Sequence, residues 1–228
     1  TGEKKLLVIL GPTASGKSAL AVQIAQIYNG EVISVDSRQV YKKLDIGTGK
    51  ITKKEMRGIP HHLLDIADPH RTFTVERYIM LAKKALRDIW KRKKLPILCG
   101  GTGFYIDALI YGKNLPSVKP NLKLREKLEK KSAEELFKIL QKKDQKRAQS
   151  IDQFNKRRLV RSLEIIDALG KVPKISLQPI DAKILLIGVA KNKNELKNTI
   201  RIRLIKRMQQ GLIQEVRTLH DESLSWKR

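Results

Sequence analysis

The stretch Leu6-Leu-Val-Ile-Leu-Gly-Pro-Thr-Ala-Ser-Gly-Lys-Ser18 decides the fold of the chain. Its apolar first half is typical of a buried strand, and it leads directly into the P-loop pattern Gly-x-x-x-x-Gly-Lys-Ser. In this pattern, glycines let the backbone curl, and successive N–H groups donate hydrogen bonds to phosphate oxygens. The lysine neutralises phosphate charge, and the serine hydroxyl binds a Mg²⁺ ion. A helix over about 17–28 would point its positive end at the same place. We therefore expect a di- or triphosphate to bind here.

Further strands and helices alternate along the chain. Apolar runs predict buried strands at 31–35, 95–99 and 183–189, and helical patterns cover 73–94, with Thr74 as its N-cap, and 104–111. Residues 42–72 are rich in glycine and proline and are expected to form loops. This order predicts an α/β fold, a P-loop NTPase-like parallel sheet flanked by helices.

A charged segment without strand candidates interrupts this pattern. It follows a proline-bounded linker at Pro116 to Pro120, and its helical patterns span about 121–131, 132–149 and 153–169, with Gly170 as the stop. We therefore predict a first part of the core at 1–116, an all-helical insertion domain at 117–176, and a return to the core at 177–228 with a strand and C-terminal helices.

The composition limits the partners of the chain. A formal net charge of +25 favours a polyanion, and nucleic acid is the better explanation than a lysine-rich surface alone. No run of about 18 apolar residues and no signal sequence is present, so we expect no membrane contact. The single cysteine, Cys99, fits a cytoplasmic protein. We expect a monomer.

Five blocks in order give the chain a resemblance to a known family. They are Gly11-Pro-Thr-Ala-Ser-Gly-Lys-Ser18, Asp36-Ser-Arg-Gln-Val-Tyr41, Asp45-Ile-Gly-Thr48, Pro60-His-His-Leu-Leu-Asp65 and Gly100-Gly-Thr-Gly-Phe-Tyr105. Together they resemble the tRNA dimethylallyltransferases, also called tRNA isopentenyltransferases, and the resemblance runs from Lys5 to the last residue. It implies transfer of a dimethylallyl group from dimethylallyl diphosphate to the exocyclic N6 amine of the adenosine 3′-adjacent to the anticodon in tRNA, with release of diphosphate.

The resemblance also implies roles for the phosphate-binding segment. Its residues would hold the diphosphate of the donor, and Ser18 would bind Mg²⁺, the expected cofactor. The predicted diphosphate-binding residues are Gly11, Pro12, Thr13, Ala14, Ser15, Gly16, Lys17 and Ser18. Arg203, eight residues before Gly211, matches the diphosphate-binding arginine of the family.

Asp36 follows a predicted strand, so it should lie at the sheet edge where ligands of parallel sheets bind. From its position alone it is either a catalytic or metal-binding carboxylate or a turn residue. The resemblance implies that Asp36 is the base for the adenine amine and that Thr102 touches the reacting nucleotide. Asp36, Thr102 and Arg203 form the predicted catalytic set. The residues that follow Asp36 would contact the flipped-out adenosine and its neighbours; they are Ser37, Arg38 and Gln39.

The insertion is expected to bind the anticodon stem-loop of tRNA. Arg125 lies in a Leu-Arg-Glu match to the family, and Arg157, Arg158 and Arg161 lie in a second matching segment. On a helix these last three would share a phosphate-binding face. A solvated basic helix is the alternative.

The sequence departs from the family pattern in places. The usual Gly-Thr-Ala-Lys-Pro block reads Gly47-Thr-Gly-Lys-Ile51, without the proline that fixes the turn, and Phe104 stands where leucine is commoner. We expect the C-terminal helices of the family to lie beyond residue 228 or to be absent. His61 and His62 are expected to be structural.

Three other functions stay open at this point. A small-molecule kinase would use the same loop on ATP but leaves the net charge unexplained. An adenylate isopentenyltransferase of the cytokinin type would prenylate a free nucleotide, which the basic insertion argues against. A non-catalytic RNA-binding module would not require Lys17, Ser18 and Asp36, but all three residues are present.

Overall fold

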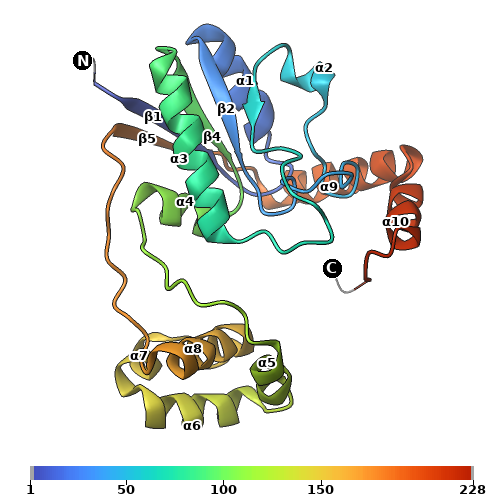
Figure 1. The fold of residues 1–228 in the computed structure, drawn as a ribbon. Coiled ribbons are helices and arrows are strands. Elements are labelled where there is room, and N and C mark those ends of the chain that lie inside the picture. Colours follow the sequence, from blue (N-terminus) through green and yellow to red (C-terminus); the bar gives the residue numbers. More distant parts are fainter. Residues whose placement is uncertain (1–2, 227–228) are drawn as a thin grey trace. The chain divides into compact units, whose positions relative to one another are not determined.

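A computed structural model describes residues 3–226 of the chain (Figure 1). The chain divides into two compact units. The first, the core unit, runs up to Gly112 and resumes at Gln178, and the second, the helical unit, is Lys113–Leu177. The chain leaves the core unit once and returns to it once.

The core unit contains a five-stranded sheet in which all neighbouring strands are parallel, in the order β3-β2-β4-β1-β5. Its strands are β1 (Lys5–Leu10), β2 (Gly30–Val35), β3 (His61–His62), β4 (Leu95–Gly100) and β5 (Lys183–Gly188). The predicted parallel sheet is therefore confirmed. The two-residue strand β3 lies in the segment that we expected to be loop only, because two residues carry no periodicity.

Helices cover both faces of this sheet. Successive residues of a strand point to opposite faces, so Leu6 and Val8 pack with α3 (Val75–Lys91) and α4 (Gly103–Ile110), whereas Leu7 and Ile9 pack with α1 (Lys17–Ile27). The predicted N-cap of α3 is confirmed, since the Thr74 side chain accepts a hydrogen bond from the backbone N–H of Arg77. The remaining helices of the core unit are α2 (Lys53–Met56), α9 (Lys193–Gln209) and α10 (Leu212–Asp221).

Residues 183–189 were predicted to form a buried strand; the strand is present, but the prediction that it is buried is wrong. In β5, Leu185 and Leu186 are 63% and 53% exposed. The reason is that β5 is the last strand in the sheet and pairs only with β1. An apolar run predicts a strand but does not distinguish an edge strand from a central one.

The helical unit contains α5 (Leu122–Glu129), α6 (Ala133–Lys143), α7 (Gln145–Ser150) and α8 (Lys156–Leu169), which pack around a leucine-rich core. The single helix expected over 132–149 is two helices. Asp144 breaks it, because its φ of −153° is not helical and its side chain caps α7 by accepting a hydrogen bond from the N–H of Arg147. Gly170 ends α8 as predicted.

None of the helices in residues 3–226 has the length and apolar character needed to cross a membrane.

Candidate active site

The P-loop lies at the carboxyl end of β1, where the backbone turns sharply into α1. Gly16 has φ +97° and Ala14 has φ +67°, so this turn needs the left-handed conformation at two residues. The Ser15 N–H donates to the Pro12 carbonyl at 3.3 Å, and Lys17 Nζ donates to the same carbonyl at 3.0 Å. The loop is thus curled in the form that the sequence predicted.

A cavity of about 260 Å³ opens beside this loop within the core unit. It is bounded by the P-loop and α1, by the carboxyl ends of β2 and β4, and by the loop around residues 48–51. Helix α2, the residue Arg57 that follows it, and α9 complete the lining. The lining residues are Thr13, Ala14, Gly16, Lys17, Ser18, Ala19, Val22, Gln23, Asp36, Gln39, Thr48, Gly49, Ile51, Glu55, Arg57, Cys99, Gly100, Arg203 and Arg207.

The structure therefore brings many of the predicted residues together. Lys17, Asp36 and Arg203 come from three separate parts of the sequence and line one cavity. Burial lowers the pKa of Lys17; the nearby Asp36 carboxylate opposes this shift and the Arg203 guanidinium adds to it. The predicted residues of the core unit that do not line the cavity are Gly11, Pro12, Ser15, Ser37, Arg38 and Thr102.

Asp36 lines the cavity and also forms a turn. Its Oδ1 atom accepts hydrogen bonds from the backbone N–H groups of Arg38, at 2.8 Å, and Gln39, at 3.3 Å. The turn role that the sequence left open is therefore observed, and the catalytic or metal-binding role stays a prediction. Since both bonds fall on Oδ1, the carboxylate is oriented by the turn and Oδ2 is the oxygen left for a ligand.

Thr102 lies behind this turn, outside the cavity lining. Its Oγ1 atom accepts a hydrogen bond from the Ser37 N–H at 3.1 Å, and its own N–H donates to the Val35 carbonyl at 3.2 Å. The glycine turn after β4 is therefore tied to the end of β2, which fixes the segment that carries Asp36.

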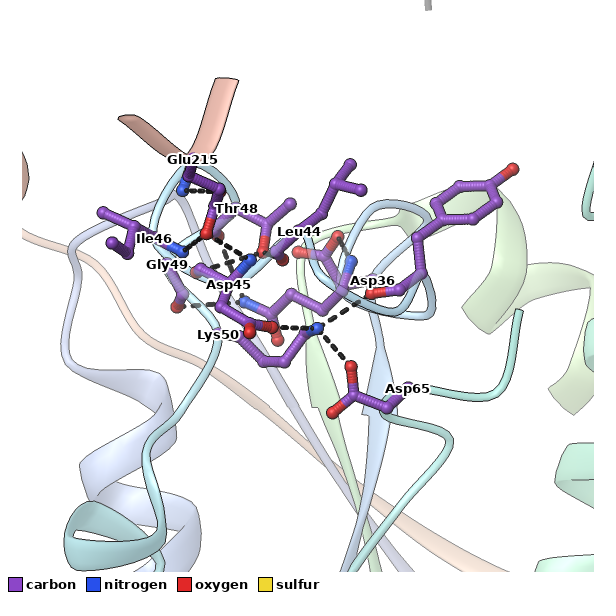
Figure 2. A network of polar contacts seen from close by, with 12 residues as sticks. Asp36, Leu44, Asp45, Ile46, Thr48, Gly49, Lys50, Asp65 and Glu215 are labelled. Carbon is purple, nitrogen blue, oxygen red and sulfur yellow. Dashed lines mark hydrogen bonds and ion pairs between the residues drawn. The ribbon is translucent and has the colours of Figure 1, made fainter. Parts of the chain in front are cut away.

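The loop at residues 44–50 is held by a network of polar contacts (Figure 2). Lys50 Nζ donates to the Tyr41 carbonyl at 2.8 Å and pairs with the carboxylates of Asp45 and Asp65. The Gln39 side chain donates to the carbonyls of Thr48 and Gly49. This block lacks the usual proline, and side-chain hydrogen bonds hold it instead.

Glu215 of α10 holds the same loop from the other side (Figure 2). Its carboxylate accepts hydrogen bonds from three consecutive backbone N–H groups, those of Asp45, Ile46 and Gly47, at 2.7 to 2.9 Å. Nothing in the local sequence around Glu215 indicates this role, because its partners are 168 to 170 residues away.

Arg207 lines the cavity and was not predicted from the sequence. It lies one helical turn after Arg203 on α9, and its pKa is lowered by burial and by the charge of Arg203. The i, i+4 spacing from Arg203 was a signal that could have found it.

In the helical unit, two of the arginines expected to bind tRNA are engaged by a buried carboxylate. Arg125 donates from Nε and Nη2 to the two oxygens of Glu164, each at 2.9 Å. Arg161 also pairs with Glu164 and donates to the Val118 carbonyl at 3.0 Å. Arg157 and Arg158 are exposed. Of the four arginines, Arg125 and Arg161 are therefore bound to Glu164, whereas Arg157 and Arg158 are exposed to solvent.

Glu31 and His62 form a polar cluster at the start of β2, away from the carboxyl edge of the sheet. His62 Nε2 lies 2.7 Å from a Glu31 oxygen, and Arg92 Nη2 lies 2.7 Å from the same atom. Burial alone would raise the pKa of Glu31, but its hydrogen bonds from Arg92, His62 and Lys94 lower the pKa to about 2. The position of His62 in this cluster accords with a structural role.

The sequence of the chain is similar to that of known proteins. The family model described as IPP transferase matches residues 39–227. The tRNA dimethylallyltransferase of Anoxybacillus flavithermus is 42% identical over 225 residues, which cover 97% of this chain and 72% of that protein.

Two solved structures are similar to the chain. One is the full-length tRNA isopentenylpyrophosphate transferase of Bacillus halodurans, with a TM-score of 0.70 and 38% identity over 98% of this chain and 72% of that one. The other is a eukaryotic dimethylallyltransferase acting on tRNA, with a TM-score of 0.81 and 31% identity over 96% of this chain and 56% of that one.

Proposed function

Because the chain belongs to the IPP transferase family, we propose that it transfers a dimethylallyl group from dimethylallyl diphosphate to tRNA. The acceptor is the exocyclic N6 amine of the adenosine 3′-adjacent to the anticodon, and diphosphate is released. One observation carries this proposal: Lys17, Arg203 and Asp36 line the same cavity, so an anion-binding end and a carboxylate meet in one site.

The anion-binding end of the cavity suits the diphosphate of the donor. Diphosphate leaves as its C–O bond breaks, and its developing charge is stabilised by N–H groups and cations that are already in place. The P-loop backbone, Lys17 and Arg203 supply these groups, and the N-terminus of α1 adds the positive end of its dipole.

The residues present also fit a Mg²⁺ ion bound together with the diphosphate. Within residues 3–226 no group of three His, Cys, Asp or Glu side chains could form an all-protein metal site. Mg²⁺ in phosphate sites needs only one or two protein ligands, with phosphate oxygens and waters completing the shell. The hydroxyl of Ser18, which lines the cavity in the first turn of α1, would be that ligand. The ion would supply further charge neutralisation to the leaving group.

Asp36 acts as the base in this proposal. The adenine nitrogen forms a bond to C1 of the dimethylallyl group while the C1–O bond breaks, the electron pair leaves with the diphosphate, and the amine proton moves to the carboxylate. The turn holds Oδ1 on the N–H groups of Arg38 and Gln39, and Oδ2 is the oxygen that takes the proton in this proposal. A positioned general base contributes on the order of 10²–10⁴-fold to the rate.

tRNA is the macromolecular partner, and the net charge of +25 supports it by attracting a polyanion. The bases of an anticodon loop are unpaired, which lowers the cost of moving one adenosine into a site. We place Ser37, Arg38, Gln39 and Thr102 around this nucleotide and assign the phosphate contacts to Arg125, Arg157, Arg158 and Arg161. We propose that the enzyme is a monomer. We also propose that it is cytoplasmic, because its free, buried Cys99 thiol accords with a reducing compartment.

Transfer of radiolabel from dimethylallyl diphosphate to bulk tRNA tests the proposal, with free AMP as a competing acceptor and ATP as a competing donor. We expect label in tRNA only, abolished by Lys17→Ala. Label in AMP would assign the chain to nucleotide prenylation, and phosphate transfer from ATP without prenyl transfer would overturn the proposal.

A further inference from the structure

Two arginines of α9 line the cavity, and neither is bonded to the two carboxylates that also line it, those of Asp36 and Glu55. Arg203 and Arg207 are one helical turn apart and both line the cavity. Within residues 3–226, neither guanidinium forms an ion pair or a hydrogen bond with a side chain of the protein. Unneutralised neighbouring cations are unfavourable, and an anion bound between them would remove the repulsion.

Gly49 makes room for the second arginine. A Cβ atom added at Gly49 would overlap the guanidinium of Arg207, whereas the same addition at Gly103 meets nothing. Gly49 also has φ +60°, a conformation that disfavours other residues. The Arg207 side chain therefore reaches the cavity across the bare backbone of Gly49.

The loop cannot easily move to relieve such an overlap, because hydrogen bonds hold it on several sides. The Gly49 carbonyl accepts from Gln39 Nε2 at 3.2 Å, and its N–H donates to the Ile46 carbonyl at 3.1 Å. Glu215 and Lys50 hold the flanking residues (Figure 2).

We propose that Arg207 is a second diphosphate-binding arginine of this site, and that Gly49 is the residue that admits it. This inference rests on the proposed function, since the anion is the diphosphate of the prenyl donor. A guanidinium binds two phosphate oxygens at once through its planar fork, so Arg203 and Arg207 together add two such forks to the phosphate-binding groups of the P-loop.

Binding of inorganic diphosphate in the presence of Mg²⁺, measured by calorimetry, tests the inference without requiring tRNA. Arg207→Met removes the charge and keeps an apolar stem, and we expect it to weaken binding by about 10-fold or more. Arg201→Met is the matched control, because Arg201 is an exposed arginine of the same helix outside the cavity, and it should change binding by less than about 2-fold.

A double-mutant cycle tests the role of Gly49. Gly49→Ala should weaken diphosphate binding more in the wild-type background than in the Arg207→Met background, because the overlapping guanidinium is then gone and only the strain of the positive φ remains. The KM for dimethylallyl diphosphate in tRNA prenylation should rise with the loss of diphosphate affinity in each variant. Melting temperatures would show whether either variant is unfolded.

The outcomes separate the inference from the proposed function. Wild-type binding of diphosphate that Arg207→Met leaves unchanged would overturn the inference alone. Equal and additive effects of Gly49→Ala in both backgrounds would overturn the role of Gly49. A wild-type protein that binds no diphosphate would overturn the inference and the proposed function together.

Discussion

Arg125 and Glu164 form a two-bond ion pair in the helical unit, with Nε and Nη2 of the arginine each 2.9 Å from a separate carboxylate oxygen. Glu164 is only 1% exposed, and it also pairs with Arg161 and accepts the Asn121 N–H. One buried carboxylate thus joins the start of α5 to the middle of α8. Two of the four arginines that the sequence predicted as tRNA contacts, Arg125 and Arg161, therefore stabilise the unit that carries them.

Glu164→Gln should destabilise the helical unit strongly. The substitution removes the charge that neutralises two partly buried arginines, and breaking a buried pair of this kind costs about 3–5 kcal/mol. Chemical denaturation would measure the loss. Glu126→Gln is a matched control on α5, because its ion pair with Lys130 is long, at 3.8 Å, and exposed; it should cost less than about 0.5 kcal/mol. Equal effects of the two substitutions would contradict the structural role of Glu164.

The stability should depend on pH through the same carboxylate. Burial alone would raise the pKa of Glu164, but hydrogen bonds from Arg125, Arg161 and the Asn121 N–H lower it to about 2, against 4.5 for a free glutamate. A depressed pKa means that the stabilisation is complete above about pH 4.5 and is lost as the pH falls toward 2. The difference in unfolding free energy between the wild type and Glu164→Gln should therefore shrink over this window. A difference that stays constant down to pH 2 would show that the carboxylate is not selectively stabilised in its charged form.

Asp36→Asn separates the chemical role of Asp36 from its role in the turn. Asparagine keeps an oxygen that can accept from the N–H groups of Arg38 and Gln39 but removes the basic carboxylate. We expect prenyl transfer to fall by about 10²–10⁴-fold, with tRNA affinity and melting temperature close to wild type. Asp36→Ala, which removes both roles, should in addition lower the melting temperature. Full activity in the asparagine variant would refute the base assignment.

Arg157 and Arg158 are the arginines of α8 whose loss should report on tRNA binding without disturbing the fold. Both are exposed, whereas Arg161 is bound to Glu164 and the Val118 carbonyl. Replacing the pair by alanine should weaken tRNA binding and reduce the slope of log K against log salt by up to about two, one for each phosphate contact. Unchanged affinity would leave this face as solvated surface.

Much of the core unit follows from local sequence patterns. Apolar runs predicted β1, β2 and β4, Thr74 predicted the start of α3, and the P-loop pattern predicted the turn at Gly16, because each of these features is determined within a few residues. The same reasoning placed Asp36 at the sheet edge, where it lines the cavity.

The remainder depends on partners that are distant in sequence. Arg125 and Glu164 are 39 residues apart, and Glu215 lies 168 residues from Gly47, so no local pattern reports either contact. The exposure of β5 depends on its position at the sheet edge, which the order of strands in space decides. The break at Asp144 is different, because an aspartate before a new helical turn is a recognisable N-cap signal that the long charged pattern concealed.

Glu215→Gln should loosen the loop that forms one wall of the cavity. In the wild type, three backbone N–H groups donate to the two carboxylate oxygens of Glu215. Glutamine has an NH₂ group in place of one of these oxygens, so at least one backbone N–H loses its acceptor. We expect a loss of about 1–3 kcal/mol in stability and faster hydrogen exchange at residues 45–47. Because Thr48 and Gly49 of this loop line the cavity, the KM for dimethylallyl diphosphate should rise while tRNA affinity stays constant. Asp221→Asn, on the same helix, is the control and should leave the stability, the exchange rates at residues 45–47 and the KM unchanged. An exchange rate at residues 45–47 equal to that of the wild type would show that the loop holds its shape without Glu215.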